Sequence, residues 1–153
     1  MFNKSLLNKF KSLKTPFYYY NLDILNKNIS ELFSSLEKTN KVHFALKSNS
    51  NKKLLKILKL SGLGIDAVSS NEIKRAIEVG FSPRDIVFAG VGKSDDEIHY
   101  ALQKEISYLN CESFEEIDVI NEISKNMNKI ADISIRINPS IKTGTHKNIE
   151  TGN

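Results

Sequence analysis

Five short apolar runs recur along the chain, and segments with the apolar spacing of amphipathic helices separate them. The runs cover residues 42–46, 65–68, 86–89, 106–109 and 133–137. The helical segments between them cover residues 54–60, 72–79, 95–103 and 114–127. Short, mostly apolar runs that alternate with helices are typical of parallel strands covered by helices. The rhythm therefore predicts an α/β fold, either an open doubly wound sheet or a (β/α) barrel, and periodicity alone does not choose between them.

The first 40 residues precede this rhythm and have a different character. Residues 1–15 are rich in lysine, with apolar residues at helical spacing, and predict a short amphipathic helix. The aromatic residues 17–20 favour a strand. A second helix is expected to follow, with Asn21 or Asp23 as its N-cap.

Composition narrows the functional classes. The chain has 153 residues, of which 40% are hydrophobic and 26% charged, as is typical of a folded domain. Its formal net charge of +4 permits anionic ligands, but the lysines are dispersed and the arginines few, so no nucleic-acid partner is expected. No apolar run approaches the roughly 20 residues of a membrane span, and the N-terminus does not read as a secretory signal. The single cysteine suits the cytoplasm, and no ligand spacing predicts a metal site.

Polar residues or glycine follow each apolar run. They are Lys47, Ser69 with Ser70, Gly90, Asn110 and Asn138. In both α/β architectures, ligands bind at this carboxyl edge of the sheet. Serine, asparagine and glycine are also ordinary turn residues and need no ligand to explain them. Lys47 differs, because a lysine that closes a buried strand costs desolvation free energy unless it has a partner.

Three residues are candidates for chemistry. A lysine that desolvation deprotonates can form a Schiff base with an aldehyde, although an ion-paired lysine, or one that reaches solvent, is the commoner case. Asp66 lies within an apolar run, where a carboxylate needs a hydrogen-bond donor or a cation. Glu72 stands at the start of a helix that Ser70 or Asn71 can cap, and whose backbone donors could meet an anion. Alternatively, Glu72 is simply a favourable charge in a first helical turn.

Six motifs in the order of the chain carry a family resemblance. They are TPFYYYNLDIL, HFALKSNSN, GLGIDAVSSNEIKRAIEVGFSPRDIVFAGVGKSDDEI, YLNCES, IRINPS and THKNIETG. From about Thr15 to Asn153, the chain resembles the N-terminal part of the pyridoxal-phosphate-dependent diaminopimelate decarboxylases, which have the alanine-racemase-like barrel. The segment ALKSN is shared with ornithine and arginine decarboxylases. FAGVGK followed by DDEI, and RINP followed by THKNIETG, point more narrowly to the diaminopimelate branch.

The resemblance implies that the chain is the N-terminal portion of a (β/α)8 TIM-like barrel that binds pyridoxal 5'-phosphate, with about five βα units present. Residues 1–40 would be a lead-in of helix, strand and helix, and residues 41–153 the partial barrel. The family's C-terminal β domain would be absent. We expect the isolated fragment to be inactive, because its sheet would keep two open edges and no phosphate site.

Residue by residue, the resemblance assigns four positions. Lys47 matches the catalytic lysine to which the cofactor is covalently attached. Asp66 matches an acid that tunes the charge of that lysine, and Arg136 matches an arginine near the face of the cofactor. The resemblance also implies that Glu72 supports the arrangement of Asp66 and Lys47.

Other motif residues receive no catalytic role. His146, Thr151 and Gly152 match a loop signature of the diaminopimelate group, for which we expect a structural or gating role. The Cys-Glu-Ser segment at Cys111 copies the family's catalytic cysteine motif, but it follows the fourth apolar run, whereas the family places that motif in the C-terminal domain. We therefore expect Cys111 to be a small buried or half-buried residue.

The implied reaction is the decarboxylation of meso-2,6-diaminopimelate to L-lysine and CO2, the last step of lysine biosynthesis. The resemblance also implies a homodimer for the full-length protein. Two alternatives remain open. One is a related basic-amino-acid decarboxylase or racemase of the same fold, and the other is a non-catalytic, truncated binding protein.

Overall fold

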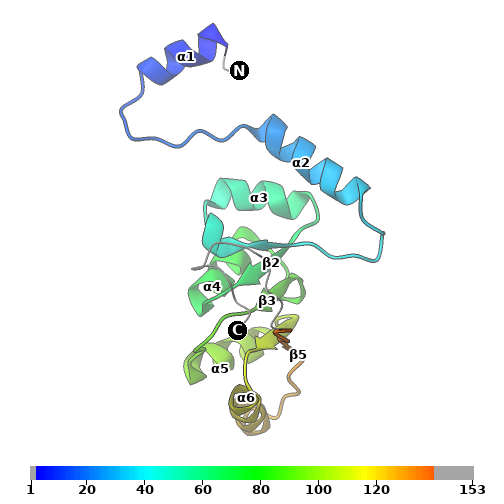
Figure 1. The fold of residues 1–153 in the computed structure, drawn as a ribbon. Helices are drawn as coiled ribbons and strands as arrows, with labels where there is room; N and C mark the ends of the chain where they lie inside the picture. Colours follow the sequence, from blue (N-terminus) through cyan, green and yellow to red (C-terminus); the bar gives the residue numbers. More distant parts are fainter. Residues whose placement is uncertain (1–2, 140–153) are drawn as a thin grey trace. The chain divides into compact units, whose positions relative to one another are not determined.

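The computed structural model describes residues 3–139. The chain divides into two compact units, Met1–Asn40 and Lys41–Asn153. In the first unit, α1 (Lys4–Lys11) and α2 (Leu22–Ser34) are joined by an irregular segment (Figure 1). The side chains of Asn3 and Asn21 cap these helices by accepting the backbone N–H groups of the third residue beyond each cap. Neither helix contains a buried residue.

The strand expected at residues 17–20 is not present. The five strands of the sheet all come from the second unit, and in the described part of the chain none of them pairs with this segment. Instead, the rings of Phe17 and Tyr19 pack against Phe10 of α1, with ring centroids 5.4 and 5.0 Å from its own. Aromatic residues favour a strand only where a neighbouring strand supplies a ladder, so their enrichment was a misleading signal here.

The second unit holds a five-stranded parallel sheet with helices between its strands (Figure 1). The strands are β1 (His43–Ala45), β2 (Gly64–Ala67), β3 (Ile86–Phe88), β4 (Tyr108–Cys111) and β5 (Ile133–Ile135). The helices are α3 (Lys52–Leu60), α4 (Ser70–Val79), α5 (Asp95–Lys104) and α6 (Phe114–Asn126). Two short 3-10 helices, η1 (Leu46–Ser48) and η2 (Pro83–Asp85), follow β1 and precede β3.

The strand order answers the question that the periodicity left open. Each strand lies between its neighbours in sequence, in the order β1-β2-β3-β4-β5, and all pairs are parallel. A doubly wound sheet reverses its order at a switch point, and this sheet does not. Because crossovers between parallel strands are right-handed, repeating them in one direction places the helices on one face. This is the arrangement of successive units in a (β/α) barrel, as expected.

Alternation along the strands explains which face carries the core. Paired residues of adjacent strands point to the same face. Residues of β2, β3 and β4 that face the helices are at most 1% exposed; they are Ile65, Ala67, Ile86, Phe88, Leu109 and Cys111. The register pairs Asp66 with Val87 and Asn110 with Ser134, so these residues lie on the opposite face. We call this second face the open face.

The boundaries of all five strands differ from the expected ones by one or two residues. The fourth strand is Tyr108–Cys111, because Ile106, only 5% exposed, is buried in the loop before the strand. Asn110 therefore lies within β4, whereas the sequence predicted that it follows the strand. The first strand ends at Ala45, where η1 begins, and the fifth ends at Ile135. The four helices after the first strand form where the sequence predicts them. Among the described residues, no helix is long and apolar enough to span a membrane.

Candidate functional site

The carboxyl ends of the five parallel strands share one edge of the sheet, and the expected site residues lie there. Lys47 is in η1, directly after β1. Asp66 is the third residue of β2, and Glu72 lies in the first turn of α4. Arg136 immediately follows β5. The fold thus brings four residues from three βα units to the same edge.

Lys47 is exposed, and the turn that holds it is anchored on both sides. The hydroxyl of Ser48 donates to the carbonyl of Ala45 at 2.8 Å, and the N–H of Asn49 donates to the carbonyl of Leu46 at 3.0 Å. Leu46 itself is only 1% exposed, so it fixes the turn in the core. The sequence suggested that Lys47 is desolvated at the end of a buried strand, but its side chain is exposed. Its candidacy therefore rests on its place at the edge and on the family pattern.

Asp66 carries an unsatisfied polar atom on the open face. Its Oδ1 is buried and has no hydrogen-bond partner within the described range, 3–139. A buried carboxylate oxygen without a donor is costly, and native structures rarely keep one without a reason. Its location one residue before the carboxyl end of β2 makes it a ready acceptor for a cationic or hydrogen-bonding ligand group.

His43 lies at the start of β1, paired with Gly64 of β2. A Cβ at Gly64 would lie 2.5 Å from Cδ2 of His43 and 2.6 Å from the carbonyl oxygen of Asp85, so only glycine fits there. Burial, and next the charge of Lys41, lower the pKa of His43, while Asp66 and Asp85 act in the opposite direction. The imidazole is therefore neutral at pH 7 and serves as packing on β2.

A serine followed three residues later by a glutamate opens each of three successive helices. The pairs are Ser69 with Glu72 in α4, Ser94 with Glu97 in α5, and Ser113 with Glu116 in α6. In each pair the serine hydroxyl accepts the N–H of the glutamate. The N-cap of α4 is thus Ser69, and the expectation of Ser70 or Asn71 is wrong, because the helix begins one residue earlier. The S-x-x-E spacing is the signal in the sequence that identifies these caps.

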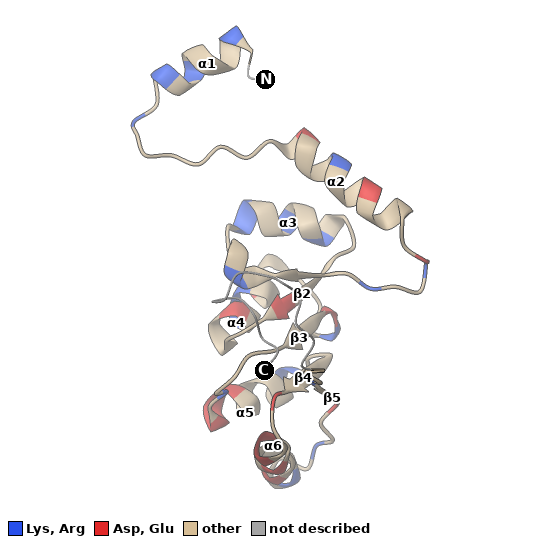
Figure 2. Ribbon diagram, in the orientation of Figure 1, with Lys and Arg blue, Asp and Glu red and all other residues tan. Residues whose placement is uncertain are grey.

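The three glutamates also fix the loops around them. Glu72 Oε2 accepts the backbone N–H of Val68 at 2.8 Å, which ties the β2–α4 loop to its helix. Glu97 Oε1 accepts the N–H of Ser70 at 2.9 Å, so α5 also caps α4. Hydrogen bonding from the Ser70 backbone holds the pKa of Glu97 below its ordinary value. Acidic residues accordingly gather at the starts of α5 and α6 (Figure 2).

Lys93, in the loop after β3, makes a buried ion pair that sequence reasoning missed. Its Nζ lies 2.6 Å from Glu116 Oε1, and the lysine side chain is only 1% exposed. The same ammonium donates to the carbonyls of Gly90 and Asn110, both at 2.8 Å. In the sequence, Lys93 stood out only as part of FAGVGK, because its partner is 23 residues away.

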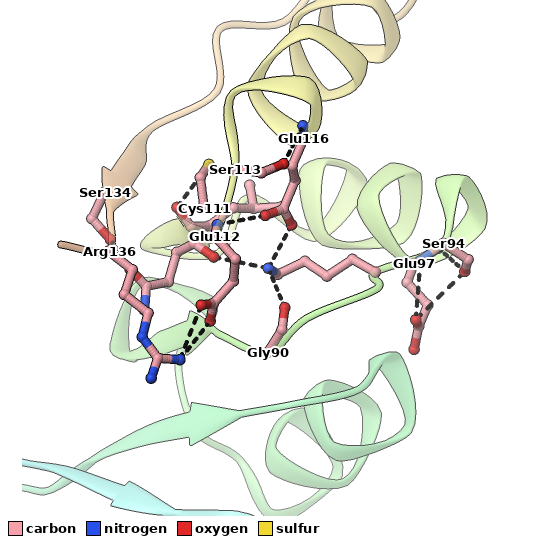
Figure 3. A network of polar contacts seen from close by, with 12 residues as sticks. Gly90, Ser94, Glu97, Cys111, Glu112, Ser113, Glu116, Ser134 and Arg136 are labelled. Atoms are coloured by element: carbon pink, nitrogen blue, oxygen red, sulfur yellow. Dashed lines mark hydrogen bonds and ion pairs between the residues drawn. The ribbon is translucent and has the colours of Figure 1, made fainter. Parts of the chain in front are cut away.

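Arg136 is held by Glu112, at the ends of the neighbouring strands β5 and β4 (Figure 3). One guanidinium nitrogen, Nη1, donates to both Glu112 oxygens, at 2.9 and 3.2 Å. The Arg136 side chain is 46% exposed and that of Glu112 only 14%. Nearby, the hydroxyl of Ser134 donates to Asn110 Oδ1 at 2.8 Å. This part of the edge therefore presents a fixed, partly accessible cation.

Cys111 is fully buried at the end of β4, as expected of a residue with a packing role. Burial raises the pKa of its thiol, the charge of Glu116 adds to this, and Lys93 acts in the opposite direction. Such a thiol is a poor nucleophile at neutral pH. His146, Thr151 and Gly152 lie outside the described residues. Within residues 3–139, no group of three or more histidine, cysteine or acidic residues could hold a metal ion.

Comparison with known families gives one clear match. The family described as "Pyridoxal-dependent decarboxylase, pyridoxal binding domain" matches residues 22–153. A diaminopimelate decarboxylase of Bacteroides thetaiotaomicron is 45% identical over 148 residues, which cover 95% of this chain and 38% of the relative. A diaminopimelate decarboxylase of Helicobacter pylori is 44% identical over 155 residues, 99% of this chain and 37% of the relative.

Solved structures agree with these sequence matches. The diaminopimelate decarboxylase of Helicobacter pylori complexed with L-lysine has a TM-score of 0.90 and 41% identity, covering 96% of this chain and 38% of that one. The arginine decarboxylase of Paramecium bursaria Chlorella virus has a TM-score of 0.74 and 26% identity, covering 92% of this chain and 38% of that one. The chain spans less than two fifths of the length of these relatives.

Proposed function

The chain belongs to the pyridoxal-dependent decarboxylases, with their pyridoxal-binding domain at residues 22–153, and from this premise we propose that it forms part of a diaminopimelate decarboxylase. The proposed reaction removes CO2 from meso-2,6-diaminopimelate and yields L-lysine. The observation that carries the proposal is the 45% identity to a diaminopimelate decarboxylase over 95% of the chain. Because the relatives are more than twice as long, the activity is proposed for the protein expressed from its complete gene.

The residues at the sheet edge fit pyridoxal phosphate. Lys47 offers a primary amine for the aldehyde of the cofactor, and Asp66 offers a buried oxygen that lacks a donor within residues 3–139. When bound, the cofactor supplies a ring that accepts the electrons left behind when the substrate carboxylate departs as CO2. The proposed site thus uses an amine from the turn directly after β1 and a carboxylate from the neighbouring strand β2.

We assign the chain's own residues the following work. Lys47 would hold the cofactor through its amine, and its Nζ would carry a proton for delivery to the substrate carbon. Asp66 favours the charged form of cationic groups beside it. Glu72 keeps the loop after β2 in place through the N–H of Val68, and Arg136 supplies a fixed positive charge.

A related basic-amino-acid decarboxylase is the second candidate. The arginine decarboxylase of the Chlorella virus shares the fold with a TM-score of 0.74, so the architecture permits this activity. Its identity of 26% is well below the 45% of the diaminopimelate decarboxylase from Bacteroides thetaiotaomicron. The difference favours diaminopimelate as the substrate.

A substrate comparison tests the proposal. The protein expressed from its complete gene is loaded with pyridoxal phosphate, and CO2 release is measured with meso-diaminopimelate, ornithine and arginine in parallel. We expect CO2 and L-lysine in equal amounts from meso-diaminopimelate and much slower release from the other two. Faster turnover of ornithine or arginine would support the second candidate, and no CO2 from any of the three would support a non-catalytic binding protein.

Three further parts of the proposal concern organisation. We propose that the barrel part begins at residue 41, that the complete protein is a homodimer, and that it works in the cytoplasm. The first follows the division of the chain into two units. The homodimer rests on the resemblance, and light scattering on the complete protein would test it. The location rests on a composition with one cysteine, and fractionation of the source cells would test it.

A further inference from the structure

Lys93 is the most completely buried charged residue of the network at the site edge, and the proposed reaction gives it no task. Its ammonium group has three protons and makes three contacts, to Glu116 and to the carbonyls of Gly90 and Asn110. The carbonyls come from the loop after β3 and from β4, and Glu116 comes from α6. One side chain therefore fixes three segments relative to one another.

A continuous series of contacts leads from Lys93 to Arg136. Glu116 binds Lys93 with Oε1, and its other oxygen, Oε2, accepts the backbone N–H of Glu112 at 2.7 Å. The carboxylate of Glu112 then binds Nη1 of Arg136 at 2.9 Å. The backbone N–H of Arg136 donates to the carbonyl of Cys111 at 2.9 Å. This bond fixes the backbone from which the Arg136 side chain extends. Figure 3 shows these contacts around Glu112, Glu116 and Arg136.

We propose that Lys93 is a positioning residue for Arg136. By holding Glu116, it sets the backbone of Glu112, whose carboxylate in turn sets the direction of the guanidinium. The consequence for catalysis rests on the proposed function, while the positioning itself is a property of this chain and can be measured without it.

Positioning explains the arrangement better than stability alone. A buried ion pair must offset the desolvation of two charges, so it is weak support for a stabilising role. The chain also offers a comparison at the opposite edge of the sheet. Lys129 binds Glu105 at 2.8 Å and the carbonyl of Leu102 at 3.1 Å, but it is 29% exposed and far from the carboxyl ends of the strands. Lys129→Met is therefore a matched control that removes a lysine–glutamate pair without touching Arg136.

Nitrogen NMR of the arginine side chains tests the positioning directly. The chain contains three arginines, Arg75, Arg84 and Arg136, so their signals are easily assigned by substitution. In mildly acidic buffer, we measure the exchange of guanidinium protons with water and the rotation about the Nε–Cζ bond. Lys93→Met should accelerate both severalfold at Arg136 and leave Arg75 and Arg84 unchanged. Lys129→Met should leave Arg136 as it is, and an unchanged Arg136 in Lys93→Met would overturn the proposal.

A second variant covers the case in which Lys93→Met does not fold, as judged by far-ultraviolet circular dichroism. Glu116→Gln keeps the shape of the side chain and weakens its bond to Lys93. It should loosen Arg136 in the same direction by a smaller factor. No change at Arg136 in this variant would likewise reject the proposal.

A double-mutant cycle then tests the consequence for the reaction. In the complete protein with pyridoxal phosphate, Lys93→Met should lower kcat/KM for meso-diaminopimelate about tenfold, which corresponds to about 1.4 kcal/mol. The loss should shrink to under about threefold when Arg136→Met is already present. Equal losses in both backgrounds would contradict the link to Arg136. If the protein with all native residues releases no CO2, the proposed function fails, and the NMR result still decides the positioning.

Discussion

Asp66 keeps a buried carboxylate oxygen without a hydrogen-bond partner among residues 3–139, and this has a measurable cost. An unsatisfied charged group is more expensive to bury than an unsatisfied amide of the same shape. We predict that Asp66→Asn raises the free energy of unfolding of the chain without cofactor by about 1 kcal/mol. The same change should weaken retention of pyridoxal phosphate by the complete protein. Urea unfolding and equilibrium dialysis measure the two effects.

For Asp66→Asn, we expect the free energy of unfolding to rise and the retention of pyridoxal phosphate to fall. A site residue that is retained at a cost to stability is expected to behave in this way. If the variant is both less stable and unchanged in cofactor retention, Asp66 is a structural residue and the proposed site loses it.

For Lys47 we predict a loss of cofactor without a loss of stability, because its side chain is exposed and contributes little to folding. Lys47→Arg keeps the positive charge but removes the primary amine that the cofactor aldehyde needs. We expect the complete protein with this change to fold normally and to lose the visible absorbance of the bound cofactor together with its activity. Absorbance spectroscopy checks this, and reduction with borohydride followed by peptide mapping should label Lys47 in the native protein.

Lys53→Arg is the control for that experiment, since Lys53 is also exposed and lies in the first turn of α3. It should keep both the absorbance and the activity. A reduced label on any lysine other than Lys47 would show that the family pattern had been transferred to the wrong residue.

At the scale of the elements, α5 begins with a capping box whose glutamate also reaches the preceding helix. Glu97 accepts N–H groups from Ser94 and from Ser70, and hydrogen bonding lowers its pKa from the ordinary 4.5. A carboxyl group whose pKa is lower in the folded state stabilises the fold at pH values above its pKa in the unfolded state. This stabilisation is lost as the pH falls through the pKa of the folded state. We predict that Glu97→Gln lowers the free energy of unfolding by about 1 kcal/mol at pH 7, and that the difference from the native chain disappears as the pH falls below 4.5.

Asp96→Asn is the matched control, because Asp96 is an exposed acid in the same first turn. It shares the interaction with the helix dipole but not the hydrogen bonds, so it should cost no more than a few tenths of a kcal/mol. Chemical unfolding at several pH values measures both variants. An equal loss in the two would mean that helix-terminal charge, and not the contact to Ser70, provides the stability.

The helices and the sheet class could be predicted from the sequence because they depend on local patterns. Apolar spacing gave α3 to α6 within a few residues, and short apolar runs gave a parallel sheet. The segment at residues 17–20 could not be placed, since a strand exists only with a neighbour and no local signal reveals the neighbour. The fourth strand was misplaced for a similar reason. Ile106 is buried in the loop before the strand, where its N–H donates to the carbonyl of Ala101 in α5, and its apolarity alone does not show that it lies outside the strand.

At the scale of the whole molecule, the site was partly predictable. The carboxyl edge follows from topology, which placed Lys47 there in advance. Asp66 was singled out as a carboxylate within an apolar run, and Arg136 was assigned only through the family resemblance. The contacts among its residues could not, because they join positions far apart in sequence. Arg136 and Glu112 are 24 residues apart, and Lys93 and Glu116 are 23 apart. Only the strand order shows that the loops after β3, β4 and β5 are neighbours.

The division of the chain at residue 40 leads to a prediction about folding. Within residues 3–139, the buried residues lie between Leu46 and Ser124, and neither α1 nor α2 contains one. The buried residues that the structure describes therefore all belong to the second unit. We predict that residues 41–153 alone unfold in urea with a free energy within about 0.5 kcal/mol of the full chain. The dependence of that free energy on urea concentration should also change little, since it follows the surface exposed on unfolding.

Leu55→Ala in the full chain provides the scale for this measurement. Leu55 lies in α3 and is 0% exposed, so truncating it should cost about 2 to 5 kcal/mol. A loss of that size on removing residues 1–40 would mean that the first unit packs against the core and that the folding unit is the whole chain. A loss near zero would support residues 41–153 as the unit that folds and carries the sheet edge where Lys47, Asp66 and Arg136 lie.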